Sequence, residues 1–194
     1  MPPTELLTPR LRLTPFTRED FDEFFEACVL DPAVIHYWWA YGQPGLTVED
    51  KRQMAIEDFV LPAEQGLRDL GLVVWTARLR DATLGPKGDF VGMAGVVPPE
   101  MPSQGSEPDL GYLLAARYQG LGLATEAGRA VVADAFERYR LERLAALVDE
   151  PNIGSSRVLE KIGFRQVLRW VGEDGNPMLR FLIERSDLEA AGRG

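Results

Sequence analysis

Two glycines in the middle of the chain constrain its fold more than any other feature. Gly120 and Gly122 lie between an apolar run that ends in Leu113 and Leu114 and the start of a long amphipathic helical pattern. A glycine loop that runs from a strand into a helix N-terminus presents bare backbone N–H groups and the positive end of the helix dipole. The pattern therefore predicts an anion site between a strand and a helix, and a pyrophosphate is the ligand that it suggests.

The rest of the chain predicts a mixed sheet flanked by helices. Apolar patterns typical of strands cover residues 11–14, 70–80, 90–97, 109–115, 144–148, 164–171 and 177–185. Helical patterns cover residues 21–29, 47–62, 123–138 and 152–162. Pro62 is expected to end the second helix, because proline removes a backbone donor. The strand, helix and strand between 109 and 148 predict a parallel crossover. We expect one α/β domain over residues 1–194, with a central sheet of about seven strands.

Composition excludes several classes of function. The 30 acidic and 21 basic side chains give a formal charge of −9, which argues against a nucleic-acid partner. A chain this acidic must bind a polyanion through local backbone donors and a few arginines. Cys28 is the single cysteine and lies on an apolar helical stripe, so neither a disulfide nor a metal site is expected. The N-terminus has no signal-like segment and no apolar run could cross a membrane, so we expect a soluble, cytoplasmic protein without a membrane partner.

The glycine loop by itself allows more than one interpretation. It is close to a dinucleotide fingerprint, with Thr125 where a third glycine belongs and Asp149 where a ribose-binding acid belongs. Against that interpretation, about five residues separate the apolar run from Gly120, and the preceding chain has an antiparallel pattern. Glycines can also serve simply to turn a chain. The loop alone leaves these alternatives open.

Two motifs together resemble one family. Arg117-x-x-Gly120-x-Gly122 matches the Q/R-x-x-G-x-G/A signature of the GNAT superfamily of acyl-CoA N-acyltransferases. The segment from Asn152 to Phe164 is similar to the N-x-x-S-x-R-V-L-E-K-x-G-F run of the branch that contains the ribosomal-protein-alanine N-acetyltransferases. The resemblance spans nearly the whole chain and is weakest over residues 36–107.

The resemblance implies the GNAT fold and direct transfer of an acetyl group from acetyl-CoA to a primary amine. The acceptor would be a protein N-terminus or a small-molecule amine, and related enzymes are often homodimers. The backbone of residues 119–124 would hold the pyrophosphate, Arg117 would flank it, and the end of the preceding strand would pair with the pantetheine. The residues thereby assigned to acetyl-CoA are Leu113, Leu114, Arg117, Gln119, Gly120, Leu121, Gly122, Leu123, Ala124, Thr125, Asn152 and Ser155.

The expected catalytic groups include one departure from the family. Many members carry a tyrosine seven residues after the asparagine of the second motif, as proton donor to the leaving thiolate, but this chain has Leu159 there. Ser155 is the natural substitute, although it could equally be an ordinary first-turn helix residue. Asp109, at the start of the fourth strand, is the candidate general base. Glu107, Glu100 or a chain of water molecules are the alternatives.

Three further features remain ambiguous from the sequence. Glu126, in the first turns of a helix, is expected to have a structural role. His36 could act as a base, and the aromatic residues from Tyr37 to Tyr41 could either close an acceptor pocket or pack in the core. The missing tyrosine and the uncertain base also favour an alternative function, that of an acyl-CoA-binding protein without catalysis.

Overall fold

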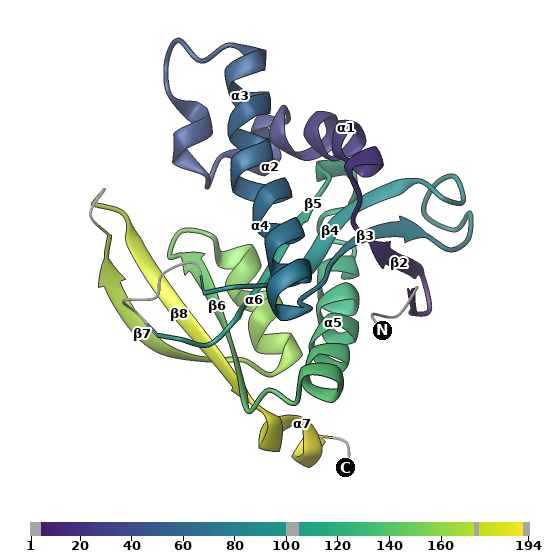
Figure 1. Cartoon of the computed structure of the whole chain (residues 1–194), viewed down its shortest axis with the longest axis vertical. Helices are drawn as coiled ribbons and strands as arrows, with labels where there is room; N and C mark the ends of the chain where they lie inside the picture. The colour runs from purple at the N-terminus through teal and green to yellow at the C-terminus, as the bar shows by residue number, and fades with distance from the viewer. Residues whose placement is uncertain (1–4, 100–104, 173–174, 192–194) are drawn as a thin grey trace.

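An eight-stranded sheet runs through the described part of the computed structural model, which comprises residues 5–99, 105–172 and 175–191 (Figure 1). Its strand order is β1-β2-β3-β4-β5-β6-β8-β7. The strands are β1 (Leu6–Leu7), β2 (Leu11–Pro15), β3 (Val74–Leu79), β4 (Phe90–Val97), β5 (Asp109–Leu114), β6 (Arg143–Asp149), β7 (Arg165–Val171) and β8 (Pro177–Glu184). Neighbours are antiparallel except β5 and β6, which are parallel. The predicted mixed sheet and its parallel crossover are confirmed.

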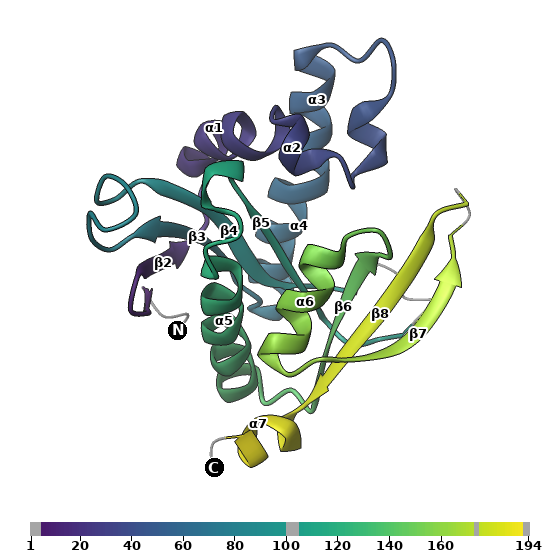
Figure 2. The same cartoon turned by 180° about the vertical axis from the view of Figure 1, so that it is seen from behind.

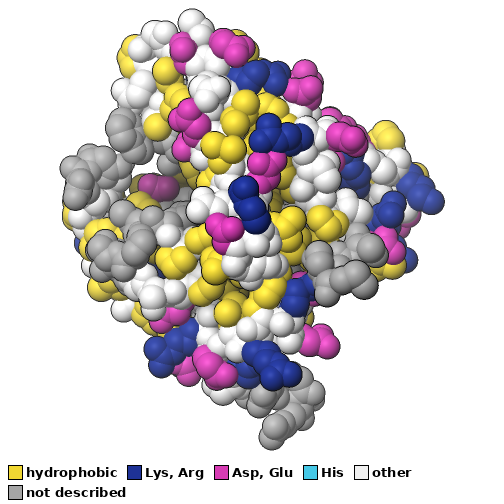
Figure 3. Space-filling model, in the orientation of Figure 1, with side chains coloured by type: hydrophobic (Ala, Val, Ile, Leu, Met, Phe, Trp, Pro, Cys, Tyr) yellow, Lys and Arg dark blue, Asp and Glu magenta, His cyan; other side chains and the backbone are white. Residues whose placement is uncertain are grey.

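Helices cover both faces of this sheet. They are α1 (Phe21–Phe24), α2 (Pro32–Ile35), α3 (Val48–Ala55), α4 (Leu61–Gln65), α5 (Leu123–Tyr139), α6 (Ile153–Ile162) and α7 (Arg185–Ala191). Helices α3 and α4 lie over one face, whose surface is drawn in Figure 3, and α5 and α6 lie over the other, seen from behind in Figure 2. The loop between β5 and α5 and the helix α6 therefore approach the sheet from the same side.

The helical segment that begins at Val48 does not end at Pro62 as expected. A π-helical turn, Ile56–Val60, precedes α4, and the Leu61 N–H donates to the carbonyl of Ile56 five residues back. Because this wider turn already interrupts the regular helical hydrogen bonds, the missing donor and the ring of Pro62 are accommodated there. Further helical turns follow as far as Leu70, so β3 begins later than the sequence pattern predicts.

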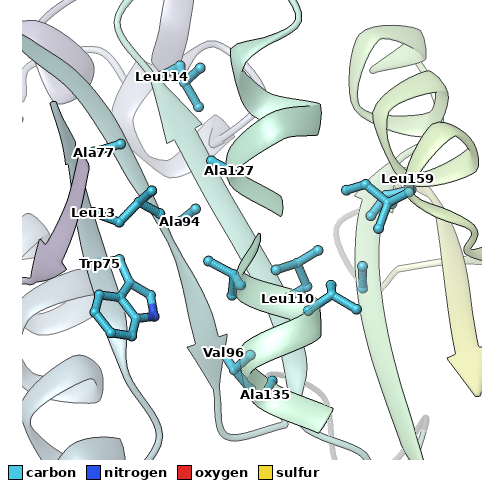
Figure 4. Close-up of a cluster of buried hydrophobic side chains, with 14 of the residues drawn as sticks. Leu13, Trp75, Ala77, Ala94, Val96, Leu110, Leu114, Ala127, Ala135 and Leu159 are labelled. Carbon is cyan, nitrogen blue, oxygen red and sulfur yellow. The ribbon is translucent and has the colours of Figure 1, made fainter. Parts of the chain in front are cut away.

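Two hydrophobic clusters fix the helices on the two faces. The first packs the small residues Ala127 and Ala135 of α5 against the sheet, as the sequence predicts, and Figure 4 shows part of it. The second joins the α1 region and Val60 to Met93 of β4. Cys28 is buried in this second cluster, and its burial, reinforced by the nearby Asp31 charge, raises the pKa of its thiol to about 12. Cys28 is thus a packing residue.

Candidate active site

The strands β5 and β6 part almost immediately after they meet. Asp109 opposite Ala145 is their register pair, and the Ala145 N–H donates to the carbonyl of Pro108 at 2.9 Å. On its other side, β5 pairs with β4 over its whole length. The divergence leaves a crevice of about 120 Å³, lined by β5, β6 and the first turn of α6. The main chain of β5 that faces this crevice is placed to pair with an extended, amide-bearing ligand.

A larger cavity of about 310 Å³ continues from this crevice along the glycine loop. It lies between α2, the end of β5, the start of α5 and one side of α6. Its lining includes these residues assigned from the sequence to acetyl-CoA: Leu113, Leu114, Gln119, Gly120, Gly122, Ala124, Thr125, Asn152 and Ser155. The structure thus brings two motifs, separated by about thirty residues of chain, around one cavity.

Backbone conformation explains the two glycines of the loop. Gly120 has a φ of 74° and Gly122 a φ of 78°, a region that residues with a side chain rarely adopt. A 3-10 turn over Ala116–Tyr118 leads into the loop, and the Gln119 amide donates to the carbonyl of Leu114 at 3.0 Å. Gly122 caps the 17-residue helix α5, so the N-terminus of a long helix opens beside the cavity. That end of the helix favours a bound anion.

Three of the assigned residues direct their side chains elsewhere. The guanidinium of Arg117 pairs with Asp89 at 3.1 Å. Leu121 is exposed and its carbonyl accepts from Arg10 at 2.9 Å, whereas Leu123 is fully buried in the core. Any contact of Leu121 or Leu123 with a ligand would therefore come from the backbone, and Arg117 is not among the residues that line the cavity.

Two cations that the sequence reasoning missed line the same cavity. Arg157 and Lys161 are both exposed and stand on one side of α6. Their spacing of four residues, which places two side chains on one helix face, is the signal that could have identified them. They place two positive charges at a cavity of an otherwise acidic chain, where these charges would favour an anionic ligand.

Glu126 ties the glycine loop to the edge of the sheet. Its carboxylate accepts from the Thr8 hydroxyl at 2.6 Å, from the Arg10 N–H at 2.8 Å and from the Arg10 guanidinium at 2.7 Å. Burial opposes ionisation, but these hydrogen bonds outweigh it and lower the pKa of Glu126. Since Arg10 also holds the carbonyl of Leu121, the structural role predicted for Glu126 includes support of the loop.

Tyr112 of β5 supplies a phenol beside Ser155. Its hydroxyl lies 2.7 Å from the Ser155 Oγ and donates to the Ser155 carbonyl at 3.1 Å. Burial raises the pKa of Tyr112 to about 12, although the Ser155 hydrogen bond acts in the opposite direction. Leu159, at the position of the family's tyrosine, is fully buried in the core. The alternation along β5, which points Leu110, Tyr112 and Leu114 toward α5 and α6, is the signal that the sequence reasoning did not use.

Asp109 and Ser155 line the same crevice. Asp109 is 4% exposed, and it stands opposite Val97 of β4 in the register of the sheet. Ser155 follows the N-cap Asn152, whose side chain accepts from the Ser155 N–H at 3.1 Å, so the capping role expected of Asn152 is present. Of the alternative bases, Glu107 pairs with Arg180 at 2.6 Å, and Glu100 lies outside the described residues.

The aromatic segment divides between different environments. His36 is exposed and packs on Tyr37, with ring centroids 3.9 Å apart, and both line the 310 Å³ cavity. The Tyr37 hydroxyl donates to the carbonyl of Pro151 at 3.1 Å, which joins α2 to the loop before α6. Tyr41 is fully buried, and the Trp39 side chain is outside the described part of the chain. This segment therefore contributes both to a cavity lining and to the core, and its role in an acceptor pocket stays a prediction.

A third cavity, of about 490 Å³, lies on the face covered by α3 and α4. Its walls are β4, β5 and the helical segment around the π-helical turn. The lining residues are Trp38, Glu57, Asp58, Phe59, Pro62, Gln65, Val74, Met93, Ala94, Gly95, Val97, Pro98, Pro99, Gly111, Tyr112 and Leu113. Tyr112 and Leu113 also line the 310 Å³ cavity, so the two spaces approach each other at β5.

Comparison with known proteins identifies the family. Residues 10–165 match the family described as an acetyltransferase (GNAT) domain. The chain belongs to the GNAT acetyltransferases. It is 32% identical over 170 residues to the uncharacterized protein YkkB of Bacillus subtilis (strain 168), which covers 86% of this chain and 90% of YkkB. The probable N-acetyltransferase YjcK of the same organism is 47% identical over 57 residues, 29% of this chain and 32% of YjcK.

Solved structures confirm the fold. A putative GNAT-family acetyltransferase from Bordetella pertussis superposes with a TM-score of 0.71 at 24% identity, over 93% of this chain and 99% of the other. The aminoglycoside acetyltransferase AAC(6')-Ib in complex with coenzyme A gives 0.71 at 20% identity, over 94% and 99%. The superfamily predicted from the two motifs is confirmed, and the dinucleotide interpretation of the loop is set aside. The ribosomal-protein-alanine branch stays a prediction.

No described helix is both long and apolar enough to cross a lipid bilayer. Over the same residues, no group of three His, Cys, Asp or Glu side chains is arranged to hold a metal ion.

Proposed function

We propose that this GNAT acetyltransferase moves an acetyl group from acetyl-CoA directly to a primary amine. The observation that carries the proposal is the convergence of the glycine loop, the diverging strand β5 and the Tyr112–Ser155 pair on one continuous crevice. Family membership supports acetyl-CoA as the co-substrate, and AAC(6')-Ib, which has the same fold, is known in complex with coenzyme A.

The chain's own groups account for cofactor binding in three parts. Backbone donors of residues 119–124 and the N-terminus of α5 hold the pyrophosphate, and Arg157 and Lys161 add charge to the phosphate side. The β5 main chain at Leu113 and Leu114 pairs with the pantetheine amides, in the space that β6 leaves by diverging. This arrangement brings the thioester to the level of Tyr112 and Ser155.

Transfer then requires two proton movements. The amine nitrogen forms a bond to the acetyl carbon, the carbon–sulfur bond breaks, and the amine loses a proton while the thiolate gains one. Asp109 takes the amine proton, directly or through water, and Ser155 delivers a proton to the thiolate. The Tyr112 phenol, 2.7 Å from the Ser155 Oγ, can return a proton to Ser155 once Ser155 has given up its own. This pair takes the place of the tyrosine that Leu159 replaces.

The acceptor remains within the two classes expected from the sequence, a protein N-terminus and a small-molecule amine. Proteins of the same fold are associated with both classes. AAC(6')-Ib is known in complex with the small molecule kanamycin, and a Vibrio cholerae protein is described as a putative ribosomal-protein-serine acetyltransferase. Cytoplasmic location and homodimer formation also stay predictions.

Release of free thiol from acetyl-CoA, measured with a panel of amines, tests the proposal. Ser155→Ala should lower kcat on the order of 10²-fold while the Kd for CoA changes by less than about threefold. Ser156→Ala is the matched control, because Ser156 occupies the same helix and its hydroxyl has no hydrogen-bond partner among the described residues. Asp109→Asn should lower kcat while the Kd for CoA stays nearly unchanged.

The outcomes separate the alternatives. Stabilisation by CoA without thiol release for any amine would favour a CoA-binding protein without catalysis. Absence of stabilisation by CoA would overturn both functions. Unchanged turnover in Ser155→Ala would leave Ser155 as a capping-turn residue only.

A further inference from the structure

The 490 Å³ cavity has the size of a site for a small molecule. Small-molecule sites commonly have volumes of about 300–1,000 Å³ and combine apolar walls with a few placed polar groups. Here Met93, Ala94 and Gly95 of β4 form an apolar floor. The cavity reaches β5 at Tyr112 and Leu113, which is where the proposed reaction takes place. Its position would let an acceptor amine reach the same part of β5.

One wall of this cavity is aromatic. Trp38 and Phe59 both line it, and their ring centroids are 4.5 Å apart. Aromatic faces attract ammonium groups as well as aliphatic chains. This wall can hold the carbon skeleton of an acceptor and favours one that carries a positive charge.

A second wall carries two carboxylates on the π-helical turn. Glu57 accepts from the Gln53 amide at 2.7 Å, and Asp58 accepts from the Tyr41 hydroxyl at 2.8 Å. Both donors are neutral, so these contacts orient the carboxylates without cancelling their charge. No Lys, Arg or His occurs among the described residues that line the cavity.

The reacting amine does not account for the two carboxylates Glu57 and Asp58. That amine must be neutral when it attacks, so it cannot also serve as the ammonium partner of a carboxylate. We infer that the acceptor is a small molecule with at least two amino groups, of which one reacts beside β5 and another binds as an ammonium to Glu57 and Asp58. This inference rests on the proposed acetyltransferase function. The formal charge of −9 further favours the approach of a polycation.

A matched pair of acceptors tests the inference. We compare 1,5-diaminopentane with 1-aminopentane in the thiol-release assay, with a short peptide that bears a free N-terminus as third acceptor. The expected kcat/KM for the diamine exceeds that for the monoamine at least tenfold. Glu57→Gln and Asp58→Asn should each reduce this preference severalfold through KM, with kcat nearly unchanged. Glu49→Gln, an exposed acidic residue of α3 that does not line the cavity, is the control.

Binding provides a readout that does not depend on turnover. Calorimetry of 1,5-diaminopentane with the CoA-bound protein should show binding that Glu57→Gln weakens. Equal kcat/KM for diamine and monoamine, a preference unaffected by both variants, or best turnover with the peptide would each overturn the inference while leaving acetyl transfer intact. Loss of thiol release with every amine, despite diamine binding, would instead contradict the proposed function, and the bound diamine would then be a ligand but not an acceptor.

Discussion

Replacement of Glu126 by glutamine should weaken both the fold and the glycine loop. In Glu126→Gln, the remaining oxygen can still accept from the Thr8 hydroxyl and the Arg10 N–H, which share one carboxylate oxygen in the native protein. The new NH2 group, however, would face the Arg10 guanidinium, a donor facing a donor. Arg10 would then lose its ion pair, and its hydrogen bond to the Leu121 carbonyl would lose support.

The structure sets the size of the effect. A hydrogen bond to a charged group contributes about 1.5–3 kcal/mol, and the side chains of Arg10 and Glu126 are 35% and 14% exposed, so we expect a loss of about 2 kcal/mol. For a chain of this length the Tm should fall by roughly 4–8 °C. Glu5→Gln is the matched control. Glu5 pairs with Arg12 at the same 2.7 Å distance, but at 38% and 60% exposure such a pair contributes about 0–1 kcal/mol.

The pH dependence gives the decisive comparison. Because hydrogen bonds lower the pKa of Glu126 in the folded protein, its stabilisation is complete above the unfolded pKa of about 4.3 and is lost as pH falls through the lower folded value. Urea unfolding should therefore show a deficit for Glu126→Gln at pH 7 that shrinks in acid. An equal loss in Glu5→Gln, or a deficit that persists at low pH, would refute the reasoning.

Two other substitutions probe the reaction and the loop. Tyr112→Phe should lower kcat on the order of 10²-fold with little change in CoA affinity, whereas Tyr139→Phe should not. Since the pKa of Tyr112 is raised to about 12, the wild-type rate should show no alkaline loss near pH 10, and a loss there that Tyr112→Phe abolishes would contradict this role. Gly120→Ala places a side chain at a φ of 74° with no atom within 4 Å, at a strain of about 1–2 kcal/mol. If the free loop relaxes and CoA binding restores this conformation, the affinity for CoA should fall about 5–30-fold. Gly42→Ala, which has similar space and no positive φ, should bind CoA normally.

Local chemistry made much of the cofactor side predictable. The cap of α6 by Asn152 and its end at Gly163, with a φ of 119°, depend on residues within one helical turn. The glycines of the loop adopt positive φ angles because they lack a side chain, a property that does not depend on distant residues. Sequence reasoning located these features because each physical cause lies beside its effect in the chain.

The reasoning failed where the cause lies elsewhere in the chain. Tyr112 acquires its place through contact with Ser155, 43 residues away, which no spacing rule between motifs expresses. Pro62 stays within a helical segment because a π-helical turn precedes it, and the sequence does not mark that turn. The third cavity depends on the same turn, since Glu57 and Asp58 belong to it. Acceptor recognition was therefore the part least accessible from sequence.

The alternation of β5 explains how two ligands can meet in this fold. The Tyr112 hydroxyl lies beside Ser155 of α6, whereas Gly111 and Leu113 alternate with Tyr112 and belong to the face that carries the 490 Å³ cavity, which Tyr112 also borders. Asp109 shares that second face by period, because its partner Val97 lines the same cavity. If β6 paired with β5 along its whole length, the sheet would separate a ligand on one face from a ligand on the other. Because β6 diverges after Asp109, the thioester can lie beside β5 and level with the acceptor. A substitution of Tyr112 should therefore alter proton transfer to the CoA thiolate. Substitutions of Asp109, Gly111 or Leu113 should instead alter the kcat/KM for the acceptor amine.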